Sequence, residues 1–353
     1  MEKKKIIVGL SGGVDSSVAL SLLKSQGLLP IGLTLRLPVW QSTADLKREE
    51  KAKKICCKLD VPHYVLDCRK DFKKLVIDYF VKEYKKGRTP NPCIVCNKYL
   101  KFAKFFEFAK KMKADFVATG HYARLRLEIR NPKSEIRKLL MAKDKKKDQS
   151  YFLALLSQKE LSQMIFPLGG YTKKEVYGIA KKAGFEPPVQ RPESQNFCFV
   201  AGKSKNFFLE QEIGPKPGPI LNKEGKVLGK HKGLYFYTIG QRKGIEFSGG
   251  PYYVLKKDNK NNALIVTKKE KDLHQKGLKI INVNWISGKE PELPLKVKVK
   301  IRYGHQPASA TLTSLKSNAY QLKFTRPQRA ITPGQFAVFY LKEVCLGGGV
   351  ITS

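Results

Sequence analysis

Apolar and polar positions follow one pattern in the first third of the chain and another in the last. Between residue 6 and about residue 120, short apolar runs alternate with stretches in which apolar residues recur at helical spacing. The runs lie at 6–10, 30–35, 64–66 and 115–119, and the helical stretches at 18–23, 72–84 and 102–112. Alternating strands and helices are typical of a parallel sheet covered by helices. We therefore predict an α/β domain with a doubly wound parallel sheet, whose ligand lies beyond the carboxyl ends of the strands.

The pattern changes in the second half of the chain. Residues 124–140 predict a hairpin, and helices are expected from Ser150 to Gly184. Beyond about residue 205, short alternating strands are separated by turn clusters at 222–225, 257–262 and 317–318, with a break near 271–278. One or two small β domains should therefore follow the α/β domain.

Charge points to a polyanionic partner. The 353 residues include 68 Lys and Arg against 30 Asp and Glu, a formal net charge of +38. So positive a surface attracts nucleic acid, although a lysine-rich proteome would also raise the charge. The apolar run after the N-terminal lysines is too short for a signal peptide, and no run has the length of a membrane helix. We expect a cytoplasmic protein with no membrane partner, whose seven cysteines are thiols, metal ligands or catalytic groups.

A phosphate loop follows the first predicted strand. The segment Ser11–Ser17, with the sequence SGGVDSS, leads directly into a helical stretch. Paired glycines let the backbone turn its N–H groups toward an anion, and the helix adds its positive N-terminal end. The loop lacks the lysine of kinase and GTPase loops. It resembles instead the loop of enzymes that split ATP into AMP and pyrophosphate in order to adenylate a carbonyl oxygen.

Two cysteine sites are candidates for chemistry. Cys93 and Cys96 form a Cys-x-x-Cys pair on a loop stiffened by two prolines, and Cys198 follows a proline-rich segment. Zinc is disfavoured because no second cysteine pair is present, and a thioredoxin-like motif would open a helix after a strand. Two interpretations stay open: the thiols hold three corners of a 4Fe-4S cluster, or they serve as nucleophile, sulfur carrier and spectator. The other cysteines are expected to be small buried hydrophobes: Cys56, Cys57, Cys68 and Cys345.

Together these features resemble the tRNA-specific 2-thiouridylase family. The resemblance extends over nearly the whole chain, through the phosphate loop and the segments 87–98, 118–122, 147–153, 198–199, 238–244, 332–335 and 345–349. It implies an α/β domain of the adenine nucleotide alpha hydrolase type (1–204), a small central β domain (205–274) and a C-terminal β-barrel (275–353). A small-molecule adenylating ligase would explain the loop but not the cysteines or the charge. A non-catalytic RNA-binding protein would not need an intact Asp15 and Ser16.

The resemblance also implies residue roles. ATP, with Mg²⁺, would be bound by Gly9, Leu10, Ser11, Gly12, Gly13, Val14, Asp15, Ser16, Leu35 and Gly120. The tRNA and its target base would be positioned by Asn91, Pro92, Cys93, His121, Lys147, Asp148, Gln149, Arg302, Tyr303 and Gln335. Cys96 would be the nucleophile, and Cys198 would receive a persulfide from a donor such as a cysteine desulfurase relay. The expected reaction adenylates the C2 oxygen of the wobble uridine and replaces it with sulfur.

One residue departs from the family pattern. Many members carry Asp at the position of Cys93. A thiol replaces a carboxylate poorly in proton transfer but well as an iron ligand. The substitution therefore favours a 4Fe-4S cluster held by Cys93, Cys96 and Cys198.

Overall fold

A parallel sheet forms the base of the molecule. The computed structural model describes residues 3–38, 44–131, 134–185, 197–200, 204–245, 250–316 and 319–352. The sheet has the strand order β3-β2-β1-β4-β7, and all its pairs are parallel. Its strands are β1 (Lys5–Gly9), β2 (Leu29–Arg36), β3 (His63–Asp67), β4 (Phe116–Thr119) and the short β7 (Met164–Ile165). The predicted α/β architecture is confirmed, although β7 was not foreseen.

Helices cover both faces of this sheet. Ile6 and Val8 of β1 pack with α1 (Val14–Ser25) and α2 (Ala44–Lys58), whereas Ile7 packs with α6 (Ala103–Lys111) on the opposite face. Successive strand residues point to opposite faces, so a continuous apolar run is what a sheet buried on both sides requires. A further helix, α8 (Lys173–Lys182), packs on α1 through Val18, Ala19, Val176 and Ala180.

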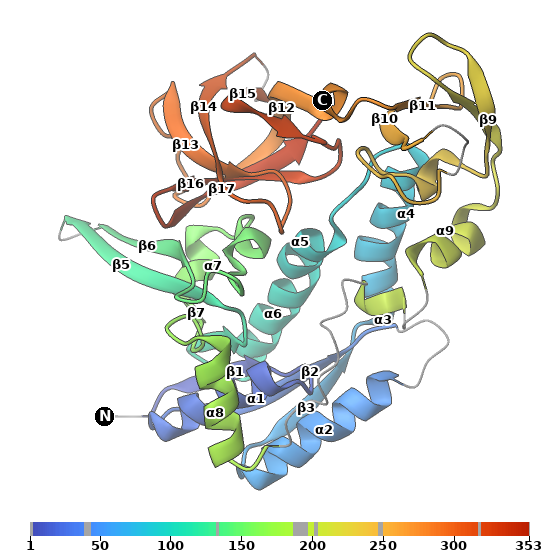
Figure 1. The fold of residues 1–353 in the computed structure, drawn as a ribbon. Helices are drawn as coiled ribbons and strands as arrows, with labels where there is room; N and C mark the ends of the chain where they lie inside the picture. The colour runs from blue at the N-terminus through green and yellow to red at the C-terminus, as the bar shows by residue number, and fades with distance from the viewer. Residues whose placement is uncertain are drawn as a thin grey trace.

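Two long helical segments lead from the sheet toward the rest of the molecule (Figure 1). The first runs through α3 (Arg69–Phe72), the π-helical η1 (Lys73–Ile77) and α4 (Asp78–Lys85). The second runs through α5 (Pro92–Cys96), the π-helical η2 (Asn97–Phe102) and α6. It starts ten residues before the predicted helix 102–112, because Pro92 stands at a first helical position, where proline's fixed φ is favourable. Shorter helices follow: η3 (Ser150–Leu153), α7 (Gln158–Ser162) and η4 (Cys198–Val200).

A small sheet follows helix α9 (Lys205–Ile213). Its strand order is β10-β11-β8-β9, formed by β8 (Gly218–Leu221), β9 (Val227–His231), β10 (Tyr253–Asp258) and β11 (Ala263–Thr267). Ile220, Val254, Leu264 and Val266 form its core together with Leu234 of the short helix η5 (Leu234–Phe236).

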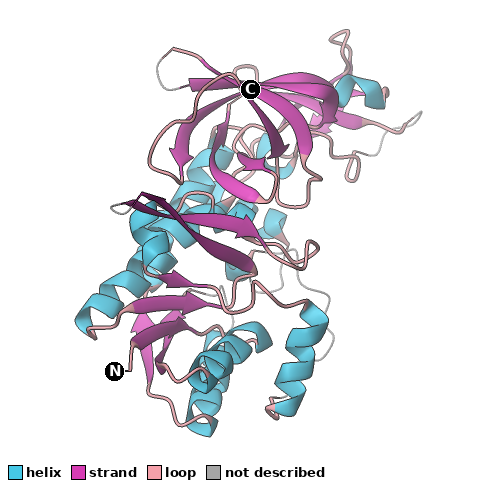
Figure 2. Ribbon diagram, turned by 90° about the vertical axis from the view of Figure 1, so that its left-hand side faces the viewer, coloured by secondary structure: helices cyan, strands magenta, loops and turns pink. Residues whose placement is uncertain are grey.

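The C-terminal strands close into a barrel (Figure 2). After η6 (Glu270–Leu273) come β12 (His274–Trp285), β13 (Leu295–Lys300), β14 (Ala308–Ser314), β15 (Ala319–Arg329), β16 (Phe336–Leu341) and β17 (Val344–Ile351). Strand β12 pairs with both β15 and β17, which closes the barrel. The predicted C-terminal β-barrel is confirmed.

The predicted hairpin joins the barrel rather than standing apart. Strands β5 (Ala123–Asn131) and β6 (Ser134–Met141) pair antiparallel, and β6 also pairs with β17 through Val344 with Leu140 and Cys345 with Leu139. The hairpin thus lies between the parallel sheet and the barrel (Figures 1 and 2). One hydrogen-bonded sheet of eight strands therefore spans both parts. Within the described part of the chain, no helix is both long and apolar enough to cross a bilayer.

Candidate functional site

A cavity of about 420 Å³ opens at the carboxyl ends of β1, β2 and β4. This is the edge at which ligands bind open parallel sheets. Its lining comes from the phosphate loop, from the two strand ends beside it and from helices on either side. The lining residues are Gly9, Leu10, Ser11, Asp15, Ser16, Thr34, Leu35, Leu37, Arg48, Glu49, Lys101, Phe105, Thr119, Gly120, His121, Gln149 and Cys198.

The phosphate loop turns sharply from β1 into α1. Gly12 has φ +70°, and a Cβ there would lie 2.5 Å from the carbonyl oxygen of Arg48 on α2. The Ser16 hydroxyl accepts from the Ser11 N–H at 3.2 Å and donates to the Gly13 carbonyl at 2.9 Å. The loop is therefore fixed by its own serines, with the N-terminal end of α1 beside the cavity.

Gly120 packs against this loop from the end of β4. A Cβ on Gly120 would lie 2.9 Å from the Asp15 carbonyl carbon and from the Ser16 nitrogen. Leu35 approaches from the end of β2 and lines the same cavity. The structure thus brings together all the residues predicted to bind ATP: Gly12 and Gly13 form the turn, Val14 begins α1, and the others line the cavity.

The two carboxylates that line the cavity are both paired with basic side chains. Arg36 donates to both oxygens of Glu49 at 2.8 and 2.7 Å. Lys173, the first residue of α8, donates to both oxygens of Asp15 at 2.7 Å. Sequence reasoning missed Lys173, because 158 residues separate it from Asp15 and no local pattern predicts that contact.

The His121 imidazole is held in a neutral form. Its Nδ1 lies 2.8 Å from the Thr119 hydroxyl, and its Nε2 lies 3.5 Å from the Asn97 side-chain amide. Burial, and after it the charge of Lys101, lowers the pKa of His121 to about 3. The ring can therefore exchange hydrogen bonds with a ligand, but it carries no charge at neutral pH.

Cys93 and Cys96 lie on helix α5 rather than on the predicted loop, because Asn91 caps a helix that begins at Pro92. The Asn91 Oδ1 accepts from the N–H groups of Cys93 at 3.1 Å and Ile94 at 3.4 Å. Cys96 is buried, while Cys93 and Cys198 are exposed and Cys198 lines the cavity. Removal of water by the surrounding protein is the main reason why the pKa of Cys93 is raised to about 11, and the charge of Cys198 adds to it. Cys93 is nevertheless exposed as a residue. Burial raises the pKa of Cys96 to about 12, with Cys198, Cys93 and Cys68 adding to the effect. All these groups are therefore close enough to influence one another electrostatically.

Lys101 is the cation among these thiols. Its charge acts against the rise in the pKa values of Cys93 and Cys96. In an α-helix, side chains five residues apart point about 140° away from each other. Cys96 and Lys101 are five residues apart, and the i→i+5 pattern of η2 brings them toward one side of the helix. A π-helical turn of this kind often marks a functional site. Lys101 thus faces both the thiols and the cavity.

The cysteines do not present the ligand set of the expected cluster. Within residues 3–352, apart from the segments left undescribed, no three His, Cys, Asp or Glu side chains gather closely enough to hold a metal ion. In this arrangement the thiols at 93, 96 and 198 do not fit a 4Fe-4S cluster. Of the remaining cysteines, Cys56, Cys68 and Cys345 are buried as predicted. The prediction for Cys57 is wrong, because it lies on the solvent side of α2.

Three family models match the chain. The tRNA methyl transferase HUP domain matches residues 4–202, the tRNA methyl transferase PRC-barrel domain residues 206–268 and the aminomethyltransferase beta-barrel domain residues 275–351. The tRNA-specific 2-thiouridylase MnmA of Clostridium perfringens is 42% identical over 366 residues, covering 100% of this chain and 99% of that protein.

The chain belongs to the tRNA-specific 2-thiouridylase family.

A second relative, the 2-thiouridylase MnmA of Halothermothrix orenii, is 42% identical over 359 residues, covering 98% of each chain. Among solved structures the likeness is weaker. The U34-tRNA thiolase NcsA from Methanococcus maripaludis with its [4Fe-4S] cluster has a TM-score of 0.38 and 19% identity, covering 61% of this chain and 69% of that chain.

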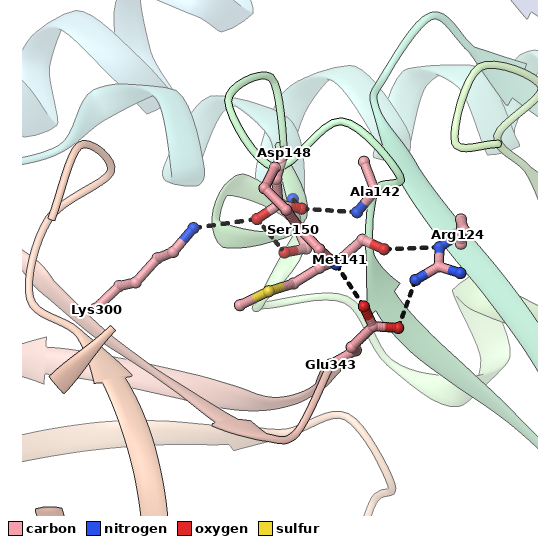
Figure 3. A network of polar contacts seen from close by, with 8 residues as sticks. Arg124, Met141, Ala142, Asp148, Ser150, Lys300 and Glu343 are labelled. Carbon is pink, nitrogen blue, oxygen red and sulfur yellow. Dashed lines mark hydrogen bonds and ion pairs between the residues drawn. The ribbon is translucent and has the colours of Figure 1, made fainter. Parts of the chain in front are cut away.

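Among the residues that 2-thiouridylases are expected to use for tRNA, His121 and Gln149 line the cavity. The Gln149 Oε1 accepts from the Tyr122 N–H at 2.9 Å. Asp148, by contrast, is buried outside the cavity lining, and Figure 3 shows the polar contacts of its carboxylate. Its carboxylate accepts from Ala142 N–H at 3.1 Å, from the N–H and hydroxyl of Ser150 at 3.2 and 3.0 Å, and from Lys300 Nζ at 3.1 Å.

The barrel residues Gln335 and Tyr303 of this 2-thiouridylase lie outside the cavity lining, against the segment before α5 and against η3. The Gln335 side chain donates to the Thr89 carbonyl at 2.7 Å, and the Thr89 N–H donates to the Pro333 carbonyl at 2.9 Å. The Tyr303 ring lies on Phe152 with 4.4 Å between centroids. The barrel therefore supports the segment that leads into Asn91. Also outside the lining are Asn91, Pro92, Cys93, Lys147 and Arg302.

Proposed function

We propose that the protein adenylates the C2 oxygen of the wobble uridine of tRNA and then replaces that oxygen with sulfur. As a member of its family, the protein uses ATP to form 2-thiouridine in tRNA, and it is a sulfurtransferase. One observation carries the mechanism: a single cavity contains both the phosphate loop and the Cys198 thiol. We assign this reaction to the cytoplasm. We further propose that residues 1–204 form the catalytic domain, residues 205–274 a small central domain and residues 275–353 the C-terminal domain.

Adenylation comes first, because a carbonyl oxygen is a poor leaving group. The C2 oxygen attacks the α-phosphorus of ATP, the bond to the β-phosphate oxygen breaks, and pyrophosphate leaves with the electron pair. The phosphate loop with its helix end is suited to that anion. We assign contact with the nucleotide to Gly9, Leu35 and Gly120, which line the cavity. Mg²⁺ would arrive with the triphosphate, whose phosphate oxygens are the ligands that this ion prefers.

Sulfur transfer follows through the two cysteines. Cys198 carries a persulfide loaded by a donor, and the Cys96 thiolate attacks the sulfur bonded to Cys198. A Cys96–Cys198 disulfide forms and hydrosulfide leaves. Hydrosulfide then attacks C2, the C2–O bond breaks, and AMP departs with the electron pair. A dithiol reductant restores both thiols. Because the pKa of Cys96 is raised to about 12, little thiolate exists before the substrate is bound.

The tRNA has to present its base to this cavity. A base that undergoes chemistry leaves its stack, and the formal charge of +38 favours the phosphate backbone. We assign contact with the base to Asn91, Pro92, Cys93, His121 and Gln149, at or beside the cavity. Backbone contacts are assigned to Lys147, Arg302, Tyr303 and Gln335. For Asp148 we propose support of its neighbour Gln149 rather than direct contact.

Nucleoside mass spectrometry tests the proposal. Unmodified tRNA is incubated with the protein, ATP and a persulfide donor, and 2-thiouridine, AMP and pyrophosphate should form in equal amounts. Cys198→Ser should abolish 2-thiouridine while pyrophosphate release persists, and Cys57→Ser, at an exposed position, serves as the matched control. Release of AMP from the parent protein without any 2-thiouridine would overturn the assignment.

A further inference from the structure

The phosphate loop carries an anionic side chain where it should receive an anion. Asp15 lines the cavity with 35% of its side chain exposed. A carboxylate beside a triphosphate or a pyrophosphate would repel it unless a cation compensates. The loop has no lysine of its own, so the compensating charge has to come from elsewhere.

Lys173 supplies that charge from the start of α8. Its ammonium contacts both Asp15 oxygens at 2.7 Å, and its side chain is only 16% exposed. The Tyr122 hydroxyl donates to Asp15 at 2.8 Å, and the Lys173 ammonium lies 5.8 Å from the Tyr122 ring centroid and 4.9 Å from that of Tyr177. Both aromatic faces favour a cation at this point.

The position of Lys173 is fixed by its surroundings. Thr172 caps α8 and shares a capping box with Glu175, while the Lys173 N–H donates to Asp144 Oδ2 at 3.1 Å. The apolar side of α8 packs on α1, the helix that follows the phosphate loop. The ammonium is therefore held against the loop by a rigid contact between helices.

We propose that Lys173 is a positioning residue that neutralises Asp15 and so allows the phosphate loop to accept the pyrophosphate part of ATP. Lys173 does not line the cavity and acts through Asp15. It thus takes, from a separate helix, the place of the lysine that kinase and GTPase loops carry within the loop. This inference rests on the ATP role proposed above for the loop.

Binding of three ligands to the full chain, measured by isothermal titration without tRNA or a sulfur donor, tests this role. Lys173→Met should weaken binding of ATP and of pyrophosphate by about tenfold or more, whereas AMP should change by no more than about threefold. Lys173→Arg should retain most of the affinity. Lys174→Met, at the exposed next position, is the matched control and should behave like the parent. Unchanged or tighter ATP binding by Lys173→Met would overturn the proposal.

A second variant separates charge compensation from mere structural support. Adding Asp15→Asn to Lys173→Met removes the uncompensated carboxylate, so pyrophosphate affinity measured without divalent cations should recover severalfold. If no recovery occurs, Lys173 only supports the fold. Should the variants not fold, acetylation footprinting of the parent applies: pyrophosphate should protect Lys173 but not Lys174, and AMP should protect neither. A parent chain that binds neither ATP nor pyrophosphate would instead contradict the proposed function itself.

Discussion

The buried ion pair between Asp148 and Lys300 is the polar contact on which the junction of the barrel with the α/β part should depend most. Side-chain exposures of 1% and 10% mean that water cannot replace either partner. At an N–O distance of 3.1 Å, the Coulomb attraction is about 5 kcal/mol at an effective dielectric constant of about 20. Much of that attraction offsets the cost of removing both charges from water.

Lys300→Met removes one charge and leaves the other buried. Loss of one partner from a buried pair costs about 3 to 5 kcal/mol. We expect the lower end, about 3 kcal/mol, because Ala142 and Ser150 still donate to the Asp148 carboxylate. Combining Lys300→Met with Asp148→Asn removes both charges, so the double variant should be about 2 kcal/mol more stable than the sum of the single losses.

Urea unfolding monitored by circular dichroism measures these losses, and hydrogen exchange at the Ala142 and Ser150 amides reports on the carboxylate directly. Lys298→Met is the matched control: it lies on the same strand, is exposed and contacts only the Ser309 hydroxyl among the bonds described. It should change the free energy of unfolding by less than about 0.5 kcal/mol. A loss below about 1 kcal/mol for Lys300→Met, or additive losses in the double variant, would refute the reasoning.

Three further predictions concern titration and crowding. Burial raises the pKa of Cys345 to about 12, so above pH 9 the unfolded chain loses this proton while the folded chain keeps it. Between pH 8 and 10 the free energy of unfolding should therefore fall about 1.4 kcal/mol less in Cys345→Ala than in the parent, while the exposed Cys57→Ala should match the parent. Burial lowers the pKa of His121 to about 3, so His121→Gln should leave the shape of the pH profile for pyrophosphate release unchanged between pH 5 and 8; a lost limb would contradict this. Gly120→Ala places a Cβ 2.9 Å from the phosphate-loop backbone and should weaken ATP binding about tenfold or more, measured by titration calorimetry. Gly170→Ala, which meets nothing within 4 Å, should bind ATP as the parent does.

Much of the α/β part could be predicted because its signals are local. Apolar runs bounded by turns mark the strands, and the SGGVDSS segment marks the phosphate loop at the end of the first one. The rule that ligands lie at the carboxyl ends of parallel strands then locates the cavity. Strand β7 could not be predicted from the sequence, because its two residues, Met164 and Ile165, are too few to show any periodicity.

Features that depend on contacts between distant segments could not be predicted in this way. The hairpin at 124–140 is visible in the sequence, but nothing in it indicates that β6 pairs with β17. Lys173 looks like one more surface lysine until α8 packs on α1. From the sequence, Asp148 in its basic loop is expected to contact tRNA. In the structure it is buried and forms an ion pair with Lys300 of the barrel. Local patterning describes each element, while tertiary packing decides which partners meet.

The sheet shared by the hairpin and the barrel also determines what happens when the chain is shortened. A chain ending before β12 would lack β17, so the N–H and C=O groups of β6 around Leu139 and Leu140 would lose their partners. Unpaired strand edges with apolar side chains recruit other chains. Such a fragment should therefore associate with its own copies even where its phosphate loop and cavity fold correctly. By pairing with β6, strand β17 of the barrel should therefore also keep the α/β part from aggregating.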